Sequence, residues 1–546
     1  MPKYNIQLSF FDDSQVNQNK YQQSGTAYID NTVAGPSLIK EKIKESLTVG
    51  ELDPFFESLN GFYALVDEEG GRIIAAVDHI RSIPLFYAQH QGELFLSDNA
   101  EWVRNAINDI TMDTLAKDEF RLTSFVTGAD TLFQNVKQLQ AGEYLIADVI
   151  DDKLQVTTSQ YFRFNHSEPK KVNEPELKKE LLRTIENSIK RLIEYANGRQ
   201  IVLPLSGGYD SRLIATILKQ KNYHNIVTFT YGRVGNTESV YSKQVADSLD
   251  LPWHFIEYSD ESWRATWAGE DRFLYQKNAS NLNSLAVVQD WLAVKELKQR
   301  ELVDNDCIFV PGHTGDFIAG GHIPDIAFEK NKFDRDDVID EIVKKHYYLG
   351  RTGLFSEQKE HWRIRISKQI TQSNITNAVD YANAVEQWNW QERQSKFINN
   401  SVRVYEFFGF DWWLPLWDRE FVDFWQTVPL ALRKRREWYN EFVTLQYQSI
   451  TQVKNVVPLK NATKPVSLPK MRKLIGSLLP NFIKVRIQNS LNIKAFYRHP
   501  HCIMGRLDEE IWLEFFKEGY AQNGIVAEIF LSELSKTHAV ITTGRT

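Results

Sequence analysis

The sequence predicts an α/β protein with two units: a layered antiparallel β-sandwich, then a doubly wound parallel sheet with many helices. Three observations lead to this fold class. Hairpin turns separate short apolar segments up to about residue 165. The apolar period then changes to that of a helix, from Glu174 to Ala196. Strand and helix patterns alternate from 200 to 257, which is typical of a parallel sheet.

Three hairpins are expected in the first unit, with turns rich in glycine or aspartate. Their strands pair as 61–67 with 72–78, 85–88 with 93–97, and 143–147 with 154–157. The apolar runs alternate poorly, which indicates burial on both faces and therefore a layered sandwich rather than an open sheet.

A polar stretch at 166–171 separates the two patterns, so we expect one domain over residues 1–168 and a second over 169–546. In the second domain the patterns predict buried strands with intervening helices, followed by a mainly helical region from Glu329 onward. The strands are expected at 200–205, 225–230 and 253–257, and the helices at 174–196, 212–220 and 238–248.

Composition narrows the function classes. The 546 residues carry a net charge of −7, which disfavours a dedicated nucleic-acid binder. No run of about 18 apolar residues occurs, the first residues lack an export pattern, and two cysteines are too few for a disulfide framework. We therefore expect a cytoplasmic protein. Between Glu441 and Asp508 the chain has eleven positive residues and no acidic one.

The segment from Leu205 to Ser211, Leu-Ser-Gly-Gly-Tyr-Asp-Ser, lies between a predicted strand and a predicted helix. Gly207 and Gly208 allow an anion to approach the backbone, and N–H groups of a helix start point toward it. Ser206 and Ser211 add hydroxyl donors. A carboxylate at Asp210 would repel phosphate, so it is better explained as a ligand of Mg²⁺. The alternative is an ordinary turn.

A second loop about 100 residues later argues against an ordinary turn. It follows the apolar segment at Cys307 and contains Pro311, Gly312 and one carboxylate, Asp316, before a glycine pair at 320–321. Two such loops with one carboxylate each suit a metal ion bridging Asp210 and Asp316.

The first loop resembles that of PP-loop ATP pyrophosphatases, and the two loops together resemble those of the asparagine synthetase family. Further matching segments, in the family's order, occur at 61–67, 78–88, 131–145 and 413–418. The resemblance covers nearly the whole chain. It implies an Ntn-hydrolase-like amidotransferase domain, with two sheets between outer helix layers (αββα), before a synthetase domain that uses ATP and Mg²⁺. The implied nucleotide-binding residues are Leu205, Ser206, Gly207, Gly208, Asp210, Ser211, Tyr231, Pro311 and Gly312.

One departure from the family concerns the first domain. Glutamine-dependent members need a cysteine directly after the initiator methionine, but this chain has Pro2 there, and its cysteines are Cys307 and Cys502. The resemblance therefore implies the amidotransferase fold without its glutaminase. Free ammonia or another amine would then be the nucleophile.

The resemblance implies adenylation of a substrate carboxylate, followed by attack of the amine. His313 stands where the family usually has glutamate and could act as the base, or it could only hydrogen-bond phosphate or backbone. Asp411 aligns with a family acid and could orient His313, or it could form a salt bridge. Lys460 and Lys464 are candidates for the family's lysine over the adenylate, or they are surface lysines.

Several alternatives stay open at this point. The carboxylate could belong to a small molecule or a saccharide, and the product could be asparagine, an amidated uronic acid or a natural product. A different class is an ATP-binding pseudoenzyme. The basic, partly apolar stretch 470–506 could contact an anionic membrane surface weakly, or it could be a packed helical hairpin. A homodimer is compatible with the sequence.

Overall fold

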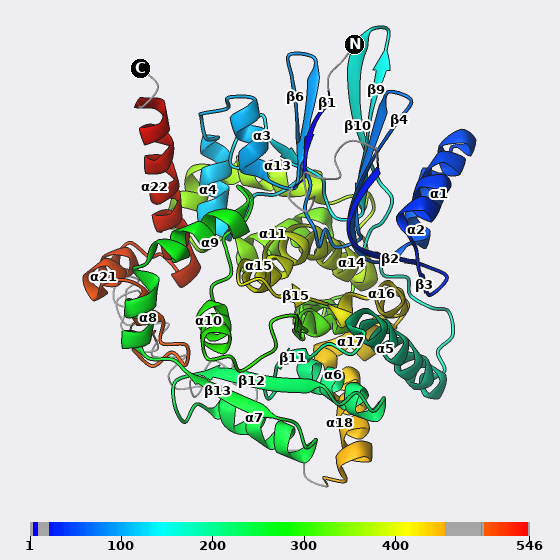
Figure 1. The fold of residues 1–546 in the computed structure, drawn as a ribbon, viewed down its shortest axis with the longest axis vertical. Helices are drawn as coiled ribbons and strands as arrows, with labels where there is room; N and C mark the ends of the chain where they lie inside the picture. The colour runs from blue at the N-terminus through cyan, green and yellow to red at the C-terminus, as the bar shows by residue number, and fades with distance from the viewer. Residues whose placement is uncertain (1–3, 9–20, 454–492, 494–495, 544–546) are drawn as a thin grey trace.

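The structure is a computed structural model that describes residues 4–8, 21–453, 493 and 496–543. Its strands form three sheets, two in the amino-terminal unit and one in the second unit, and helices pack around them (Figure 1). The predicted mixed α/β fold class is confirmed. Among the described helices, none combines the length and the apolar character that crossing a membrane requires.

The amino-terminal unit is a sandwich of a four-stranded and a six-stranded sheet. The strand orders are β1-β7-β6-β8 and β10-β9-β5-β4-β2-β3. The strands are β1 Tyr4–Gln7, β2 Tyr21–Ile29, β3 Thr32–Val33, β4 Asn60–Glu69, β5 Arg72–Val77, β6 Phe86–His90, β7 Glu93–Ser97, β8 Lys137–Gln138, β9 Glu143–Ile150 and β10 Lys153–Gln160. All three predicted hairpins are confirmed as antiparallel pairs, β4 with β5, β6 with β7 and β9 with β10.

Apolar side chains fill the space between these two sheets. Ala75 and Val77 of β5 belong to the same buried cluster as Leu94 and Leu96 of β7. On the outer faces, α1 and α2 pack against the larger sheet, and α3 and α4 pack against the smaller one. These helices are α1 Pro36–Val49, α2 Leu52–Ser58, α3 Ala100–Ala106 and α4 Thr114–Thr123. The layers therefore follow the predicted order of helix, sheet, sheet and helix.

The second unit is built on a parallel sheet with the strand order β13-β12-β11-β14-β15. The strands are β11 Ile201–Pro204, β12 Ile226–Gly232, β13 Trp253–Glu257, β14 Ile308–Phe309 and β15 Asp411–Trp412. The chain proceeds outward from β11 to β13 and then continues on the other side of β11, as predicted for a doubly wound sheet. The carboxyl ends of β11 and β14 consequently lie side by side where the strand order reverses, and such sheets bind ligands there.

The predicted helices of this unit are present as α5 Glu174–Ala196, α6 Tyr209–Gln220 and α7 Thr237–Ser248. Because α6 begins at Tyr209, three residues earlier than expected, Asp210 lies in its first turn. The later helices are α8 Asp260–Trp267, α9 Glu270–Ser280, α10 Trp291–Gln299, η2 Phe317–Gly321, η3 Asp325–Phe328, α11 Arg335–His346, α12 Leu354–Glu357, α13 Lys359–Gln369, α14 Ala378–Trp388, η4 Asn389–Ile398, η5 Asn399–Val402, α15 Arg403–Phe407, η6 Pro415–Trp417, α16 Arg419–Gln426, α17 Leu430–Arg433, η7 Lys434–Arg436, α18 Glu437–Thr451, η8 Ile503–Arg506, α21 Glu509–Lys517 and α22 Gln522–Thr543. The mainly helical character expected after Glu329 is confirmed.

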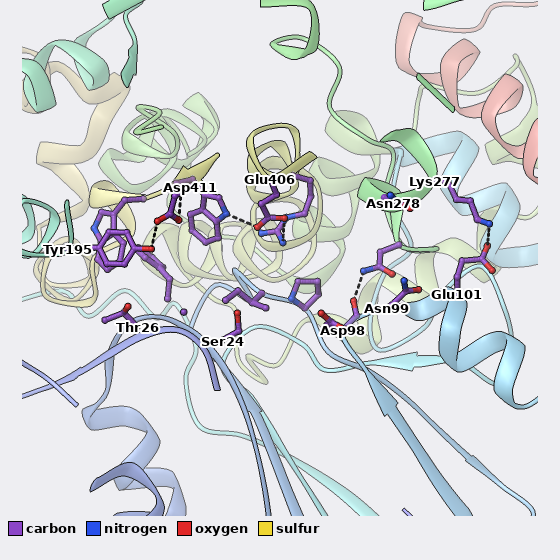
Figure 2. A pocket seen from close by; sticks show the side chains of 18 residues that line it. Ser24, Thr26, Asp98, Asn99, Glu101, Tyr195, Lys277, Asn278, Glu406 and Asp411 are labelled. Carbon is purple, nitrogen blue, oxygen red and sulfur yellow. Dashed lines mark hydrogen bonds and ion pairs between the residues drawn. The ribbon is translucent and has the colours of Figure 1, made fainter. Parts of the chain in front are cut away.

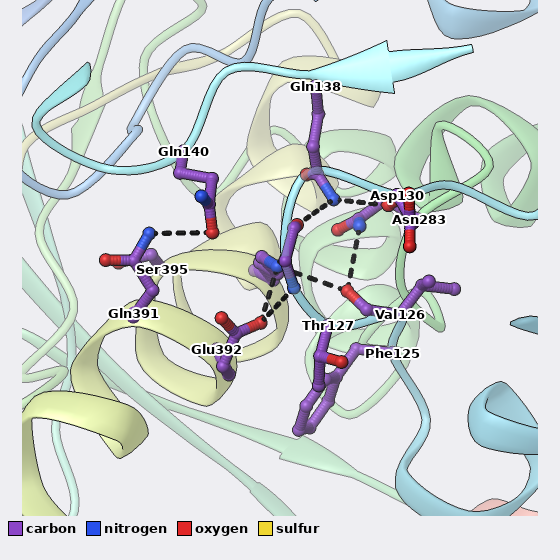
Figure 3. A network of polar contacts seen from close by, with 12 residues as sticks. Phe125, Val126, Thr127, Asp130, Gln138, Gln140, Asn283, Gln391, Glu392 and Ser395 are labelled. Carbon is purple, nitrogen blue, oxygen red and sulfur yellow. Dashed lines mark hydrogen bonds and ion pairs between the residues drawn. The ribbon is translucent and has the colours of Figure 1, made fainter. Parts of the chain in front are cut away.

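A buried polar network joins the two units around η4 (Figure 3). The Glu392 carboxylate accepts a hydrogen bond from the Gly128 N–H at 2.9 Å and pairs with Lys396 Nζ at 2.6 Å. Lys396 also donates to the Gly128 carbonyl at 2.7 Å, and Gln391 donates to Gln140 at 3.0 Å. The two charges compensate each other and satisfy backbone groups of the first unit, so the contact is specific rather than merely apolar. The domain boundary expected at residue 168, between β10 and α5, stays a prediction.

His79 is a second buried contact between the units, and it predicts an acid sensitivity. Its Nε2 donates to the Trp417 carbonyl at 2.7 Å, and burial lowers its pKa to about 3. Below a pH of about 6.5 the unfolded imidazole binds a proton that the folded state excludes, so stability is lost as the pH falls toward the folded pKa. At about 1.4 kcal/mol per pH unit, we expect a loss of about 2 kcal/mol between pH 6.5 and pH 5.

Urea unfolding of the His79→Gln variant at both pH values measures this contribution. Glutamine keeps a donor for the Trp417 carbonyl but does not titrate, so the variant should lose less stability on acidification than the parent. The matched control is His90→Gln, at the β6–β7 turn, which should keep the parent's pH dependence. An unchanged pH dependence in His79→Gln would contradict the assignment.

Candidate active site

The first phosphate-type loop connects β11 to α6 and is held by its own serines. The Ser206 N–H donates to Ser211 Oγ at 3.2 Å, and the Gly208 N–H donates to Ser206 Oγ at 3.1 Å. Arg212 donates to the Gly207 carbonyl at 2.8 Å. This curled loop leads into the start of a twelve-residue helix, where free N–H groups favour an anion.

The second loop follows β14 and touches the first. A Cβ atom at Gly312 would lie 2.7 Å from the Ser211 backbone nitrogen, and one at Gly315 would lie 2.4 Å from Asp210 Oδ1. Side chains at these two positions would push the loops apart. Glycine at 312 and 315 therefore allows the two loops to form one site.

A cavity of about 220 Å³ lies at this junction. Its lining includes most of the residues expected to bind nucleotide: Leu205, Ser206, Asp210, Ser211, Tyr231, Pro311 and Gly312. Gly207 and Gly208 form the turn beside it. The Tyr231 ring stacks on Tyr258, with ring centroids 4.9 Å apart. The structure thus brings these residues together, and their role in binding ATP stays a prediction.

The charge of Asp316 acts on Asp210, and the two loop carboxylates have different partners. Burial is the main effect and raises the pKa of Asp210 to about 6. The charge of Asp316 also raises this pKa, whereas the charge of Arg436 lowers it. Arg436 Nη2 lies 3.1 Å from Asp210 Oδ1. For Asp316, burial raises the pKa, but a hydrogen bond and charge from His322 and the charge of Arg436 outweigh it, so that pKa lies well below its ordinary value.

These carboxylates fit a magnesium ion only if phosphate completes its shell. Within the described ranges no group of three histidine, cysteine or acidic side chains could hold a metal by itself. Mg²⁺ commonly takes one or two carboxylates together with substrate phosphates and water. Asp210 and Asp316, at the edge of a phosphate-type loop, match that donor set.

His313 lies where two cavities meet. It borders the cavity at the loops and also a larger one of about 490 Å³, and the residues that line both include Gln289 and Ser401. His313 Nδ1 lies 3.0 Å from Ser401 Oγ. Burial lowers the pKa of His313, and the charges of Asp290 and Asp316 only partly oppose this shift. The imidazole is therefore neutral at physiological pH and can accept a proton.

The structure does not bring Asp411 to His313, which corrects the expected orienting role. Asp411 pairs with Ile308 at the amino end of the parallel strands, whereas His313 follows their carboxyl end. Its carboxylate accepts hydrogen bonds from Tyr195 at 2.6 Å and Arg199 at 3.0 Å. Figure 2 shows it on the wall of a separate cavity of about 620 Å³ between the two units.

Other expectations fall outside the described residues, and some site residues were not expected. Lys460, Lys464 and most of 470–506 lie in ranges that the structure does not describe. Arg436, Ser401 and Arg506 were not predicted as site residues. Arg436 lies more than 200 positions from Asp210 in the sequence, and no local pattern connects the two.

Comparison with known proteins divides the chain into two matched parts. Residues 47–162 match the glutamine amidotransferase domain family, and residues 180–441 match the asparagine synthase family. Residues 180–441 thus form an asparagine synthase-family domain. The two matches together account for about two thirds of the sequence, which confirms the resemblance that the motifs indicated, including an amidotransferase-type domain at the amino-terminal side.

Sequence similarity to an asparagine synthetase is low. Asparagine synthetase (glutamine-hydrolyzing) 1 of Bacillus subtilis (strain 168) is 26% identical over 171 residues, which are 31% of this chain and 26% of that protein. The match thus spans about a quarter of the relative's length.

Two solved structures show weak similarity. Glutamine phosphoribosylpyrophosphate amidotransferase from B. subtilis, complexed with ADP and GMP, is 11% identical, with a TM-score of 0.19, over 54% of this chain and 62% of its own. The U34-tRNA thiolase NcsA from Methanococcus maripaludis is 11% identical, with a TM-score of 0.19, over 52% of this chain and 82% of its own.

Proposed function

We propose that the chain is an ATP-dependent, AMP-forming ligase that joins a substrate carboxylate to an amine or ammonia, without a glutaminase of its own. The observation that carries this proposal is the meeting of the two loops. They place two serine hydroxyls, Asp210 and a helix start around one cavity, Asp316 lies on the wall of a second cavity, and the neutral His313 borders both. Phosphate binding in the first cavity and acyl transfer at the histidine would suit this arrangement.

The two chemical steps make different demands on these residues. First, a carboxylate oxygen of the substrate attacks the α-phosphorus of ATP, the bond to the bridging oxygen breaks, and pyrophosphate leaves. The loop N–H groups and serine hydroxyls would hold the phosphates for this in-line attack. Asp210 and Asp316 would hold Mg²⁺, which offsets negative charge on the leaving group when bound.

In the second step the amine nitrogen attacks the acyl carbon and loses a proton, and the bond to the AMP oxygen breaks. His313 would accept that proton, because its lowered pKa leaves the ring unprotonated at neutral pH and because it borders both cavities. Ser401 Oγ, 3.0 Å from His313 Nδ1, would fix the ring orientation.

The loss of the glutaminase rests on the sequence. A glutaminase of this class uses an amino-terminal cysteine as nucleophile, but the two cysteines of this sequence, Cys307 and Cys502, both lie after the matched amidotransferase segment 47–162. We propose that the first unit keeps a structural role, through contacts such as Glu392 with Gly128. Formation of glutamate from glutamine by the purified protein would overturn this part.

A carboxylate substrate labelled with ¹⁸O tests the ligase proposal directly. If the carboxylate attacks the α-phosphorus, one labelled oxygen per turnover appears in AMP and the other stays in the amide. Label in inorganic phosphate instead would indicate an acyl phosphate and would refute AMP formation. Tight ATP binding without turnover on a panel of carboxylates and amines would indicate an ATP sensor.

Replacing His313 by glutamine should separate the two steps. We expect amide formation to fall by about 10²–10⁴-fold, because a general base typically contributes that factor, while pyrophosphate release in a single turnover persists. Rapid-quench measurement of pyrophosphate and amide in the same samples checks this. The exposed His224→Gln serves as the matched control. An equal loss of both steps in His313→Gln would assign His313 to nucleotide binding instead.

A further inference from the structure

The larger of the two cavities at His313 is built partly by residues outside the asparagine synthase match, which ends at residue 441. Its volume is about 490 Å³, more than twice the volume of the cavity at the loops. His499, His501 and Arg506 line it from the carboxyl-terminal part of the chain, together with Thr314 and Gln394. The three residues of this wall that follow residue 441 therefore lie outside the segment that matches the family.

Arg506 is a buried charge with no counterion among the described residues. Only 6% of its surface is exposed, and its Nε has no hydrogen-bond partner in that part of the chain. Within the described residues the guanidinium forms no ion pair and instead lies over Trp263, 4.1 Å from the ring centroid. Burial lowers the pKa of Arg506 to about 10, so it still carries its charge at neutral pH. An unpaired buried charge is costly unless a ligand compensates it.

Two more side chains of this cavity have unused hydrogen-bonding capacity. Thr314 Oγ1 and Gln394 Oε1 are buried and have no hydrogen-bond partner in the part of the chain that the structure describes, and their residues are 2% and 1% exposed. Thr314 also adopts a positive φ of 80°, which is unusual for a β-branched residue. Buried polar groups are normally paired, so three unpaired groups in one cavity indicate a bound polar ligand.

The other charged and titratable groups of the cavity leave a positive excess. Arg393 also lines it; burial lowers the pKa of Arg393, and the charge of the Asp316 carboxylate opposes that shift. Asp316 is already held by His322. Burial lowers the pKa of His313, His499 and His501, so these rings add no positive charge at neutral pH. Two guanidiniums thus face one carboxylate, which would also hold the metal ion under the proposed function.

We infer that this cavity binds a substrate with an anionic group other than the carboxylate that is activated, and that Arg506 recognises this second group. The inference rests on the proposed function, because it assigns the substrate class of the same site. A carboxylate is the simplest such group, since a guanidinium can bind its two oxygens together. Thr314 and Gln394 would bind polar hydrogens of the same substrate, while Val288, Phe397 and Val526 would contact its carbon skeleton.

Calorimetric titration of the full chain, with Mg²⁺ and a non-hydrolysable ATP analogue present, tests this inference with matched probes. The probes are glutarate and adipate against their monoamides, and D-glucarate against D-gluconate. Each pair differs in one negative charge. At least one dicarboxylate should bind about tenfold or more tightly than its singly charged partner, since a hydrogen bond to a charged group is stronger than one to a neutral group.

The Arg506→Gln variant should lose that preference and bind both members of the pair equally. Arg498→Gln removes the same charge from an exposed position in the same segment and should keep the preference. Arg506→Lys keeps the charge but not the planar guanidinium that can bind both carboxylate oxygens, so it should retain part of the preference. Affinity for the ATP analogue should be unchanged in all three variants, which also reports that they are folded.

The outcomes separate this inference from the proposed function. Equal binding of charged and uncharged partners by the parent protein, or an intact preference in Arg506→Gln, would overturn the inference while leaving ATP binding and label transfer to AMP as they are. Failure of every dicarboxylate to bind would also count against it. Absence of ATP binding with an intact dicarboxylate preference would instead overturn the ligase and keep Arg506 as an anion site.

Discussion

Replacing Asp210 by asparagine is expected to slow pyrophosphate release by about a thousandfold, since a metal ion that stabilises charge on phosphate contributes several kcal/mol. Asparagine keeps the size of the side chain but is a much weaker ligand for Mg²⁺. The change should not destabilise the fold. Burial raises the pKa of Asp210 to about 6, so ionising it is unfavourable, and Asp316 still attracts Arg436 in the variant.

Single-turnover release of pyrophosphate and the melting temperature measure the two effects separately. The control is Asp247→Asn, the same substitution at an exposed position of α7, which should leave both quantities unchanged. Pyrophosphate release within about twofold of the parent in Asp210→Asn would mean that this carboxylate does not hold the metal.

The largest effect on stability is expected at the buried pair of Arg433 and Glu386. Both side chains are 0% exposed, and the guanidinium makes two hydrogen bonds to the carboxylate, at 2.7 Å and 2.6 Å. Arg433 also donates to the Ile318 carbonyl at 2.9 Å, so the pair supports the second loop. Glu386→Gln should lower the free energy of unfolding by about 3–5 kcal/mol, because it leaves a buried guanidinium without a countercharge.

Denaturant unfolding of matched variants isolates the role of burial. Glu357→Gln breaks an equally well-aligned pair with Arg351, but at the surface, where solvent screens the interaction, so little change is expected. Replacing both partners, Arg433→Met with Glu386→Leu, should recover much of the loss, since apolar residues need no compensation. If Glu386→Gln were as stable as Glu357→Gln, the buried pair would not support the loop as proposed.

Much of the fold could be predicted from the sequence because its signals are local. The three hairpins carry their own turn residues, and each apolar segment has the period of one kind of element. The two loops could be recognised for the same reason. Backbone approach to an anion requires glycine, and a helix start requires residues that are adjacent in the chain. The start of α6 lies three residues before the predicted one, because Asp210 and Ser211 are compatible with either a loop or a first helical turn.

The expected role of Asp411 failed because sequence alignment does not show at which end of a strand a residue lies. Its pairing with Ile308 places it at the amino edge of the sheet, and His313 lies beyond the other edge. Arg506 is one of eleven positive residues in an acid-free stretch of the sequence. The structure shows that it is buried against Trp263 and lines the cavity at His313.

The sequence by itself determined the two loops, their glycines and carboxylates, the family, and the absence of cysteine from the amidotransferase segment. Only the tertiary structure decided which distant residues share the site: Arg436 with Asp210, Ser401 with His313, and Arg506 with the second cavity. The physical reason is that these contacts join residues far apart in the chain. Strand order, helix packing and burial bring them together, and no pattern of neighbouring residues encodes them.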